Sequence, residues 1–213
     1  MMHRYFGAYT NYHANNNRDS VELLARGGDD PASLGDYSEA IVGKGVILSN
    51  SQITDATVGV DLLGGTYAQL TNLDVDDPTS YAVRTSGANS VYLDGLDVDD
   101  SSAGANTNYG FYTESTSSGI QEIKNSDFNG LGTGIYLTND VSTTITDTDV
   151  SNSNVGVRVG AQSSASHTFD NMILSNNDIA IKVDGTGGLT MTDVDITSCL
   201  LYTSDAADDW SSV

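Results

Sequence analysis

One recurring position in this sequence carries tyrosine or a charged residue, each time directly after an apolar residue. Its members are Asp61, Arg84, Tyr112, Tyr136, Arg158 and Lys182, which include three of the eight basic residues in the chain. Guanidinium groups pair bidentately with carboxylates, and tyrosine offers a flat ring together with a hydroxyl. We therefore expect acidic polysaccharide to bind along Arg84, Tyr112, Tyr136, Arg158 and Lys182. The alternative is that these side chains only cover a sheet and offset nearby acids.

A second series carries carboxylates at another position of the same repeat. Its members are Gln52, Asp74, Asp97, Asp127, Asp149, Ile173 and Asp195. Oxygen-rich clusters attract hard cations, so the four consecutive acids Asp74, Asp97, Asp127 and Asp149 are candidate Ca²⁺ ligands. The alternative is that they are solvated surface acids, because the nonapeptide calcium repeat is absent.

No catalytic constellation is readable in the sequence. His167 stands alone, without a Ser–His–Asp or Cys–His arrangement and without paired acids in a hydrolase motif. His3 and His13 lack a third neighbour of a metal-ligand type, which argues against a metal site at that end. Catalytic residues therefore stay unknown at this level.

An internal repeat sets the spacing of both series. Its first phrase is an apolar anchor, Asn or Asp two residues later, and a second apolar residue five residues after the anchor, as in Ile145–Val150. Its second phrase is a small residue followed by an apolar one, as in Gly156-Val157. A fixed period of this size is typical of a solenoid. The anchors are Leu48, Leu70, Leu93, Ile123, Ile145, Phe169 and Met191, at intervals of 22, 23, 30, 22, 24 and 22 residues.

Each repeat is expected to form one coil of short strands. The apolar runs are short and alternate with polar residues, as strands do, and parallel coils would stack about 4.8 Å apart. The Asn or Asp after each anchor tolerates a left-handed bend and can hydrogen-bond to its equivalent in the next coil. The longest interval holds an insertion, Ser101–Asn108, which we expect to be a solvated turn. The predicted inward stack is Val60, Val83, Phe111, Ile135, Val157 and Ile181.

These motifs resemble the right-handed parallel β-helix domains of the pectate-lyase-like superfamily, over residues 40–198. The resemblance implies an all-β, single-stranded solenoid of about seven rungs, with Asn ladders and aliphatic stacks inside it. It also implies that acidic polysaccharide lies along one sheet face. A polysaccharide lyase, glycoside hydrolase or uronate epimerase is one alternative function. A structural stalk, as in surface-layer, adhesin or viral-fibre proteins, is a second alternative.

Charge limits the classes of partner. The chain has 29 acidic and 8 basic residues, a net charge of −21, which argues against nucleic acid and anionic membranes. The scarcity of Lys beside many Asp, Ser, Thr and Gly resembles proteins of extreme halophiles. No apolar run is long enough to span a membrane, and the N-terminus has no signal-peptide layout. The expected location is nevertheless extracellular or on a cell or virion surface.

The two ends depart from the repeat. Residues 1–39 are expected to cap the coil or to be the remnant of an upstream domain, with a short helix over residues 19–26. Residues 199–213 resemble the translation of a transposase-type sequencing adapter, so we expect a non-native tail on a C-terminally truncated solenoid. An uncovered last rung would invite end-to-end self-association, to which Cys199 could add a disulfide.

Overall fold

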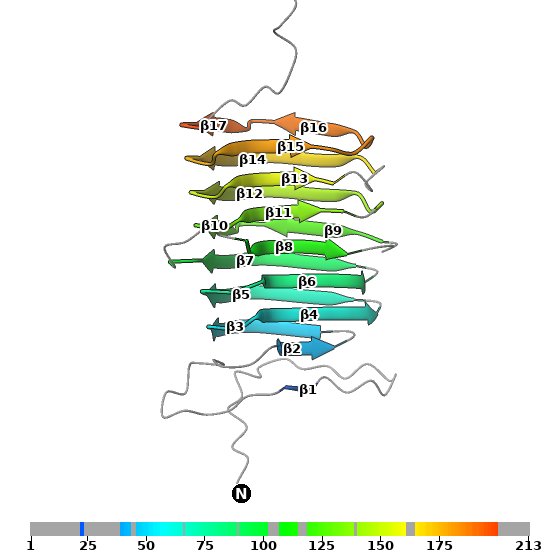
Figure 1. Ribbon diagram of the computed structural model, residues 1–213. Coiled ribbons are helices and arrows are strands. Elements are labelled where there is room, and N and C mark those ends of the chain that lie inside the picture. Colours follow the sequence, from blue (N-terminus) through cyan, green and yellow to red (C-terminus); the bar gives the residue numbers. More distant parts are fainter. Residues whose placement is uncertain are drawn as a thin grey trace, which may run out of the picture.

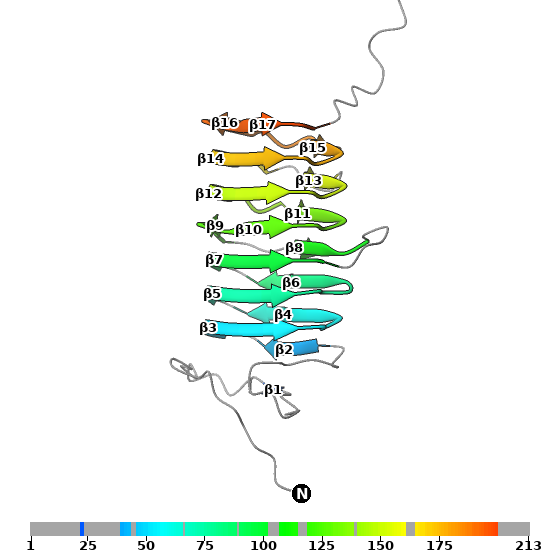
Figure 2. The same cartoon turned by 90° about the vertical axis from the view of Figure 1, so that its left-hand side faces the viewer.

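The coil is a stack of parallel strands (Figure 1). The computed structural model describes residues 22–23, 39–43, 46–65, 67–88, 90–101, 107–114, 119–138, 140–160 and 165–199. Every described regular element is a strand. The chain alternates between two sheets, and equivalent strands of successive turns lie side by side in both views (Figures 1 and 2).

Sheet A is formed by eight strands, and sheet B by nine. In order, sheet A contains β1 (Glu22–Leu23), β2 (Glu39–Gly43), β4 (Val58–Gly65), β6 (Tyr81–Ala88), β8 (Tyr109–Glu114), β11 (Thr133–Leu137), β13 (Val155–Val159) and β15 (Ile179–Val183). Sheet B contains β3 (Val46–Thr54), β5 (Ala68–Asp76), β7 (Val91–Asp99), β9 (Gln121–Lys124), β10 (Asp127–Asn129), β12 (Thr143–Ser151), β14 (His167–Ser175), β16 (Leu189–Thr192) and β17 (Asp195–Thr197). About six turns are complete, and β16 and β17 begin a seventh.

The predicted register is confirmed. Parallel pairing places Val60 beside Val83, Val83 beside Phe111, and so on through Val157 and Ile181. The first five members of this stack have no exposed surface. Burying such side chains is the main favourable term in folding, so the aliphatic and aromatic interior holds the turns together.

The bends follow the Asn and Asp residues as predicted. Asn50, Asn72, Asn125, Asp147, Asn171 and Asp193 all have φ between 49° and 50°, and Gly95 takes φ 71° in the third turn. Side chains bridge successive turns in this column, with Asn72 Nδ2 donating to Asn50 Oδ1 at 3.1 Å and Asn171 Nδ2 to Asp147 Oδ1 at 2.5 Å. The asparagines of this ladder are exposed, so the expectation of an interior ladder is wrong for this column.

A second column of left-handed residues, which the sequence did not reveal, lies five residues after the first. It comprises Asp55, Asp77, Gly130, Asn152, Asn176 and Ser198, with φ between 50° and 75°. Gly130 lies close to the neighbouring turn, because a Cβ there would lie 2.4 Å from the carbonyl oxygen of Asp100. Every described turn except the third therefore has two left-handed bends, one within and one after its sheet B segment, because Asp100 in the third turn is not left-handed.

The small residue of the second phrase lies in a sheet A strand at a point with little room for a side chain. At Gly134, a Cβ would lie 2.3 Å from Cγ1 of Val150 and 2.8 Å from the carbonyl oxygen of Gly156. The recurrence of Gly or Ala before the inward residue thus has a steric cause.

Two local expectations need correction. Within residues 19–26, the expected helix is wrong for Glu22 and Leu23, which form β1 and pair antiparallel with β2; the others lie outside the described residues. The insertion is not solvated throughout, because Asn108 at its end is 3% exposed. Asn108 Nδ2 donates to Asp100 Oδ2 and to the Pro78 carbonyl oxygen, each at 2.7 Å, and Asn108 Oδ1 accepts from the Gly132 N–H.

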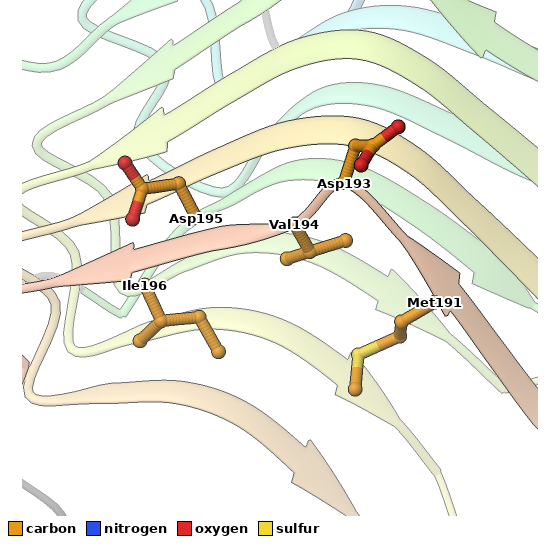
Figure 3. Close-up of a pocket in the computed structure, with 5 residues that line it drawn as sticks. All are labelled: Met191, Asp193, Val194, Asp195 and Ile196. Atoms are coloured by element: carbon orange, nitrogen blue, oxygen red, sulfur yellow. The ribbon is translucent and has the colours of Figure 1, made fainter.

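The last described rung is open. Met191 and Ile196 are 50% and 44% exposed, although their register matches the buried Phe169 and Leu174 of the turn before. Figure 3 shows Met191, Val194 and Ile196 on one side of this rung, and Asp193 and Asp195 on the other. Inward and outward positions therefore alternate here as in the closed turns.

Substitution of Val157 by Asp tests the interior stack. The change places an unpaired carboxylate in a fully buried position, and we expect it to lower the free energy of unfolding by about 3 kcal/mol or more. Thermal or denaturant unfolding measures this loss. Thr144→Asp adds the same charge at an exposed site and is the control. Equal stability of the two variants would contradict the inward assignment.

Candidate functional site

The predicted outward series lies in one row across sheet A. Asp61 pairs with Arg84, Arg84 with Tyr112, Tyr112 with Tyr136, Tyr136 with Arg158, and Arg158 with Lys182. The row therefore crosses six neighbouring strands without a gap. Five of its members are partly exposed, whereas Asp61 is only 1% exposed.

Four tyrosines, Tyr81, Tyr109, Tyr112 and Tyr136, gather at the middle of this row and form what we call the tyrosine strip. The near-parallel pairs are Tyr81 with Tyr109, at 5.3 Å between ring centroids, and Tyr109 with Tyr136, at 5.7 Å. Tyr112 is tilted and contacts the other three rings at 5.0 to 5.4 Å. Aromatic pairs at such distances stabilise a sheet by about 0.5–1.5 kcal/mol each beyond their buried area.

The orientation of the rings decides what they can offer a ligand. Tyr109 is stacked between Tyr81 and Tyr136, so other rings cover its faces. The outer ends of the stack carry cations, because the Arg84 guanidinium lies 5.4 Å from the Tyr81 centroid and that of Arg158 lies 4.7 Å from the Tyr136 centroid. The strip therefore presents mainly ring edges and hydroxyls, and not the open faces that flat stacking of a sugar requires.

A glycine keeps the Tyr136 ring close to the sheet. A Cβ at Gly160 would lie 2.9 Å from Cε2 of Tyr136, inside normal contact distance. The absence of a side chain at residue 160 thus allows the ring to lie over the backbone.

Ion pairs occupy both ends of the row. At the lower end, Arg84 pairs bidentately with Asp61, and its Nε lies 3.0 Å from Oδ1 of that buried carboxylate. At the upper end, Nε and an Nη of Arg158 both lie 2.8 Å from Oδ2 of Asp184. Lys182 Nζ lies 3.7 Å from the other oxygen of the same carboxylate. The basic residues predicted to bind a ligand therefore already have carboxylate partners.

The sequence analysis did not predict three residues of this site, which are Tyr81, Tyr109 and Asp184. Tyr81 and Tyr109 stand three residues before Arg84 and Tyr112, and they pair with each other across β6 and β8. Asp184 directly follows β15, two residues after Lys182. The sequence does contain a signal for Tyr81 and Tyr109, because Tyr-x-x-Arg and Tyr-x-x-Tyr occur at equivalent positions of successive turns. Nothing in the spacing indicates that Asp184 turns back toward Arg158.

The carboxylate series lies on sheet B, in the predicted register. Asp74, Asp97, Asp127 and Asp149 are Cα partners on consecutive strands. Gln52 Nε2 donates to Asp74 Oδ2 and to Asp76 Oδ2, each at 3.0 Å. Within the described residues, no three His, Cys, Asp or Glu side chains are grouped as a metal site would require. A row of single carboxylates does not by itself make a cage for Ca²⁺.

Burial and like charge together raise the pKa of two members of this series. Burial, followed by the neighbouring carboxylates, raises the pKa of Asp74 above its usual value. Burial and the adjacent Asp97 and Asp149 raise the pKa of Asp127 in the same way. Both shifts mean that the folded protein holds these protons more tightly than the unfolded chain does.

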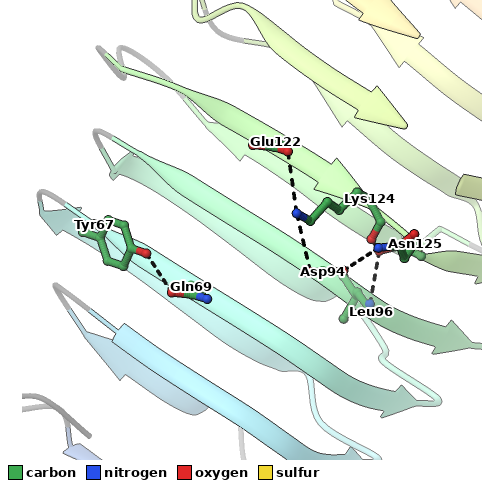
Figure 4. A network of polar contacts seen from close by, with 8 residues as sticks. Tyr67, Gln69, Asp94, Leu96, Glu122, Lys124 and Asn125 are labelled. Carbon is green, nitrogen blue, oxygen red and sulfur yellow. Dashed lines mark hydrogen bonds and ion pairs between the residues drawn. The ribbon is translucent and has the colours of Figure 1, made fainter. Parts of the chain in front are cut away.

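In β7 and β9 of sheet B, a lysine lies close to two acidic side chains and offsets part of their charge (Figure 4). Lys124 Nζ lies 3.6 Å from Asp94 and 4.0 Å from Glu122. Asn125 Nδ2 donates to Asp94 Oδ1 at 2.7 Å, one turn below, where Gly95 supplies no side chain to the bend ladder. These contacts form a partly exposed network that offsets part of the negative charge of sheet B.

His167 faces the interior and is fully buried. Its Nδ1 accepts a hydrogen bond from the Thr143 N–H at 3.3 Å, and Thr143 Oγ1 donates to Gln121 Oε1 at 3.0 Å. Burial lowers the pKa of this imidazole, consistent with a neutral ring whose Nδ1 carries no proton. This residue therefore belongs to a polar column within the core.

Replacement of Asp127 by Asn tests the repulsion in the carboxylate series. Since the folded pKa of Asp127 is raised, ionisation costs stability as the pH rises above the unfolded value. Because solvent screens the exposed Asp127, Asp127→Asn should stabilise the protein by only about 0.5 kcal/mol at pH 7 and by progressively less as the pH falls toward 4. Denaturant unfolding across this pH range measures the difference. Asp178→Asn, at an exposed position outside the series, is the control, and an equal gain in both variants would contradict the repulsion.

Comparison with known proteins addresses the fold. Residues 109–208 match the family described as right handed beta helix region, a match that covers slightly less than half of the chain and includes strands β8 to β17. Comparison with curated proteins and with solved structures gives no match. The parallel coil and this family match agree with each other and are consistent with the pectate-lyase-like superfamily. The protein is a right-handed parallel β-helix.

Proposed function

We propose that this β-helix binds an acidic polysaccharide along the outward face of sheet A, at the tyrosine strip and the basic residues beside it. The observation that carries the proposal is the continuity of this surface. Four tyrosines in mutual contact and three basic residues occupy neighbouring strands from β6 to β15. In a chain of net charge −21, such a concentration of bases and phenols on one face is a specific feature.

The contacts would be polar as much as apolar. Ring edges and phenol hydroxyls are the parts of the strip that a ligand can reach, so we expect hydrogen bonds from Tyr112 and Tyr136 to sugar hydroxyls. Guanidinium and ammonium groups at the upper end would contact carboxylates of the polymer. The ring faces would contribute chiefly to holding the strip rigid.

A structural role is the second candidate, and one observation favours it. Every base of the row has a carboxylate partner in the free protein, and the tyrosines stack on each other. These contacts would stabilise a stalk without any ligand. No comparable observation favours an activity as lyase, hydrolase or epimerase. Arg158 and Asp149 are the arginine and the acid that could imitate the Asp cluster beside a catalytic Arg of pectate lyases, and they lie on different sheets.

An extracellular or surface location forms part of the same proposal, because that is where polysaccharide of this kind is met. In the described part of the chain, no helix has the length and apolar character needed to cross a membrane. End-to-end self-association through the open last rung also stays a prediction.

The double variant Tyr112→Phe with Tyr136→Phe tests the binding face. It removes two hydroxyls and keeps the stacked rings, so we expect folding to be unchanged and affinity for an acidic polysaccharide to fall about tenfold or more. A glycan array selects the polymer, and calorimetry measures the affinity.

Tyr67→Phe, at an exposed tyrosine directly before β5 of sheet B, is the matched control. Equal affinity of the double variant and the wild type would exclude the tyrosine strip as the binding face. If the wild type binds no glycan at all, the structural role stands instead.

A further inference from the structure

The two basic ends of the tyrosine strip differ in exposure. At the lower end, the side chain of Arg84 is 24% exposed and that of Asp61 only 1%. At the upper end, the side chains of Arg158, Lys182 and Asp184 are 32%, 42% and 27% exposed. The lower pair is thus a partly buried structural pair, whereas solvent reaches all three members of the upper cluster.

This difference in exposure decides which basic residue can leave its carboxylate partner in the protein and bind a carboxylate of the ligand. If Arg84 turned to a ligand, the Asp61 carboxylate would stay buried without its counter-charge, which is strongly unfavourable. If Arg158 turned to a ligand, Asp184 could remain charged in contact with water. Only the upper cluster can therefore exchange its carboxylate at low cost.

The upper cluster also has an excess of positive charge. Among the described residues, Asp184 is the one carboxylate paired with both cations, with Arg158 on Oδ2 at 2.8 Å and Lys182 on Oδ1 at 3.7 Å. Arg158 in addition lies over the Tyr136 ring, so the cluster is continuous with the tyrosine strip. A second carboxylate would find one uncompensated charge there, and Arg donors that are held in place.

We propose that Arg158 and Lys182 form the subsite for the carboxylate of an acidic sugar, and that Asp184 occupies this subsite as an internal competitor in the free protein. Arg84 takes no part in recognition and serves to neutralise Asp61. The inference rests on the proposed function, since it assigns the acidic group of the ligand to one end of the same face.

The test is a variant that should bind more tightly. Asp184→Asn keeps the size of the side chain and removes its charge. We expect its affinity for a uronic-acid trisaccharide to rise about fivefold at low salt, the effect of removing one neighbouring charge in water. Its affinity for the same trisaccharide with reduced, neutral carboxyl groups should be unchanged. Calorimetry with both probes measures these values.

Two further variants complete the design. Asp170→Asn, in β14 of sheet B, removes the same charge on a different sheet from the cluster and should leave both affinities unchanged. Adding Lys182→Gln to Asp184→Asn should abolish the gain for the acidic probe. Circular dichroism and melting temperature report whether each variant is folded.

The outcomes separate the inference from the proposed function. If the wild type binds the acidic probe but Asp184→Asn gives no gain, or gives the same gain for the neutral probe, the subsite is wrong and the binding face stands. If neither the wild type nor Asp184→Asn binds either probe, both are overturned.

Discussion

In-register parallel pairing is the constraint on which the rest of this molecule depends. Each residue lies beside its equivalent in the neighbouring turns, about 4.8 Å away, so a favourable choice at one position is repeated and so is an unfavourable one. Val60, Val83, Phe111 and Ile135 stack into a core by this rule. The same rule brings tyrosine next to tyrosine on sheet A and aspartate next to aspartate on sheet B. Interior and surface chemistry thus have one geometric origin.

The two sheets resolve repeated charge in different ways. On sheet A, each base meets a carboxylate, either within the row, as with Arg84 and Asp61, or from the next bend, as with Asp184. On sheet B, Asp97, Asp127 and Asp149 follow one another, and burial together with these two neighbouring carboxylates raises the pKa of Asp127. The described coil therefore has one face, on sheet A, whose bases are paired and where the Arg158–Lys182–Asp184 cluster keeps one excess positive charge, and one face that remains strongly negative. The proposed binding face for an acidic polymer lies on sheet A for this reason.

Most of the fold could be predicted because it depends on periodicity. A repeat of 22 to 24 residues fixes which side chains are inward, and the bends follow because Asn and Asp accept a left-handed backbone. For the site, the sequence predicted which residues lie side by side on neighbouring strands, but it did not predict how their side chains are oriented. Whether the Tyr136 ring shows its face or its edge depends on side-chain torsions and on neighbours such as Gly160, for which the spacing has no signal. The antiparallel β1 was missed because its two residues, Glu22 and Leu23, follow no repeat.

The spacing of the strands also fixes the length of the proposed binding surface along the coil. Tyr112 and Lys182 are three strand steps apart along the coil, roughly 14 Å at the usual spacing of parallel strands. Since each turn contacts only the turns above and below it, the gain or loss of a whole turn would change this length by one step and leave the local contacts intact. The length of polysaccharide that such a surface can contact therefore changes only in steps of one whole turn. This change does not depend on which residues stand at the two ends of the surface.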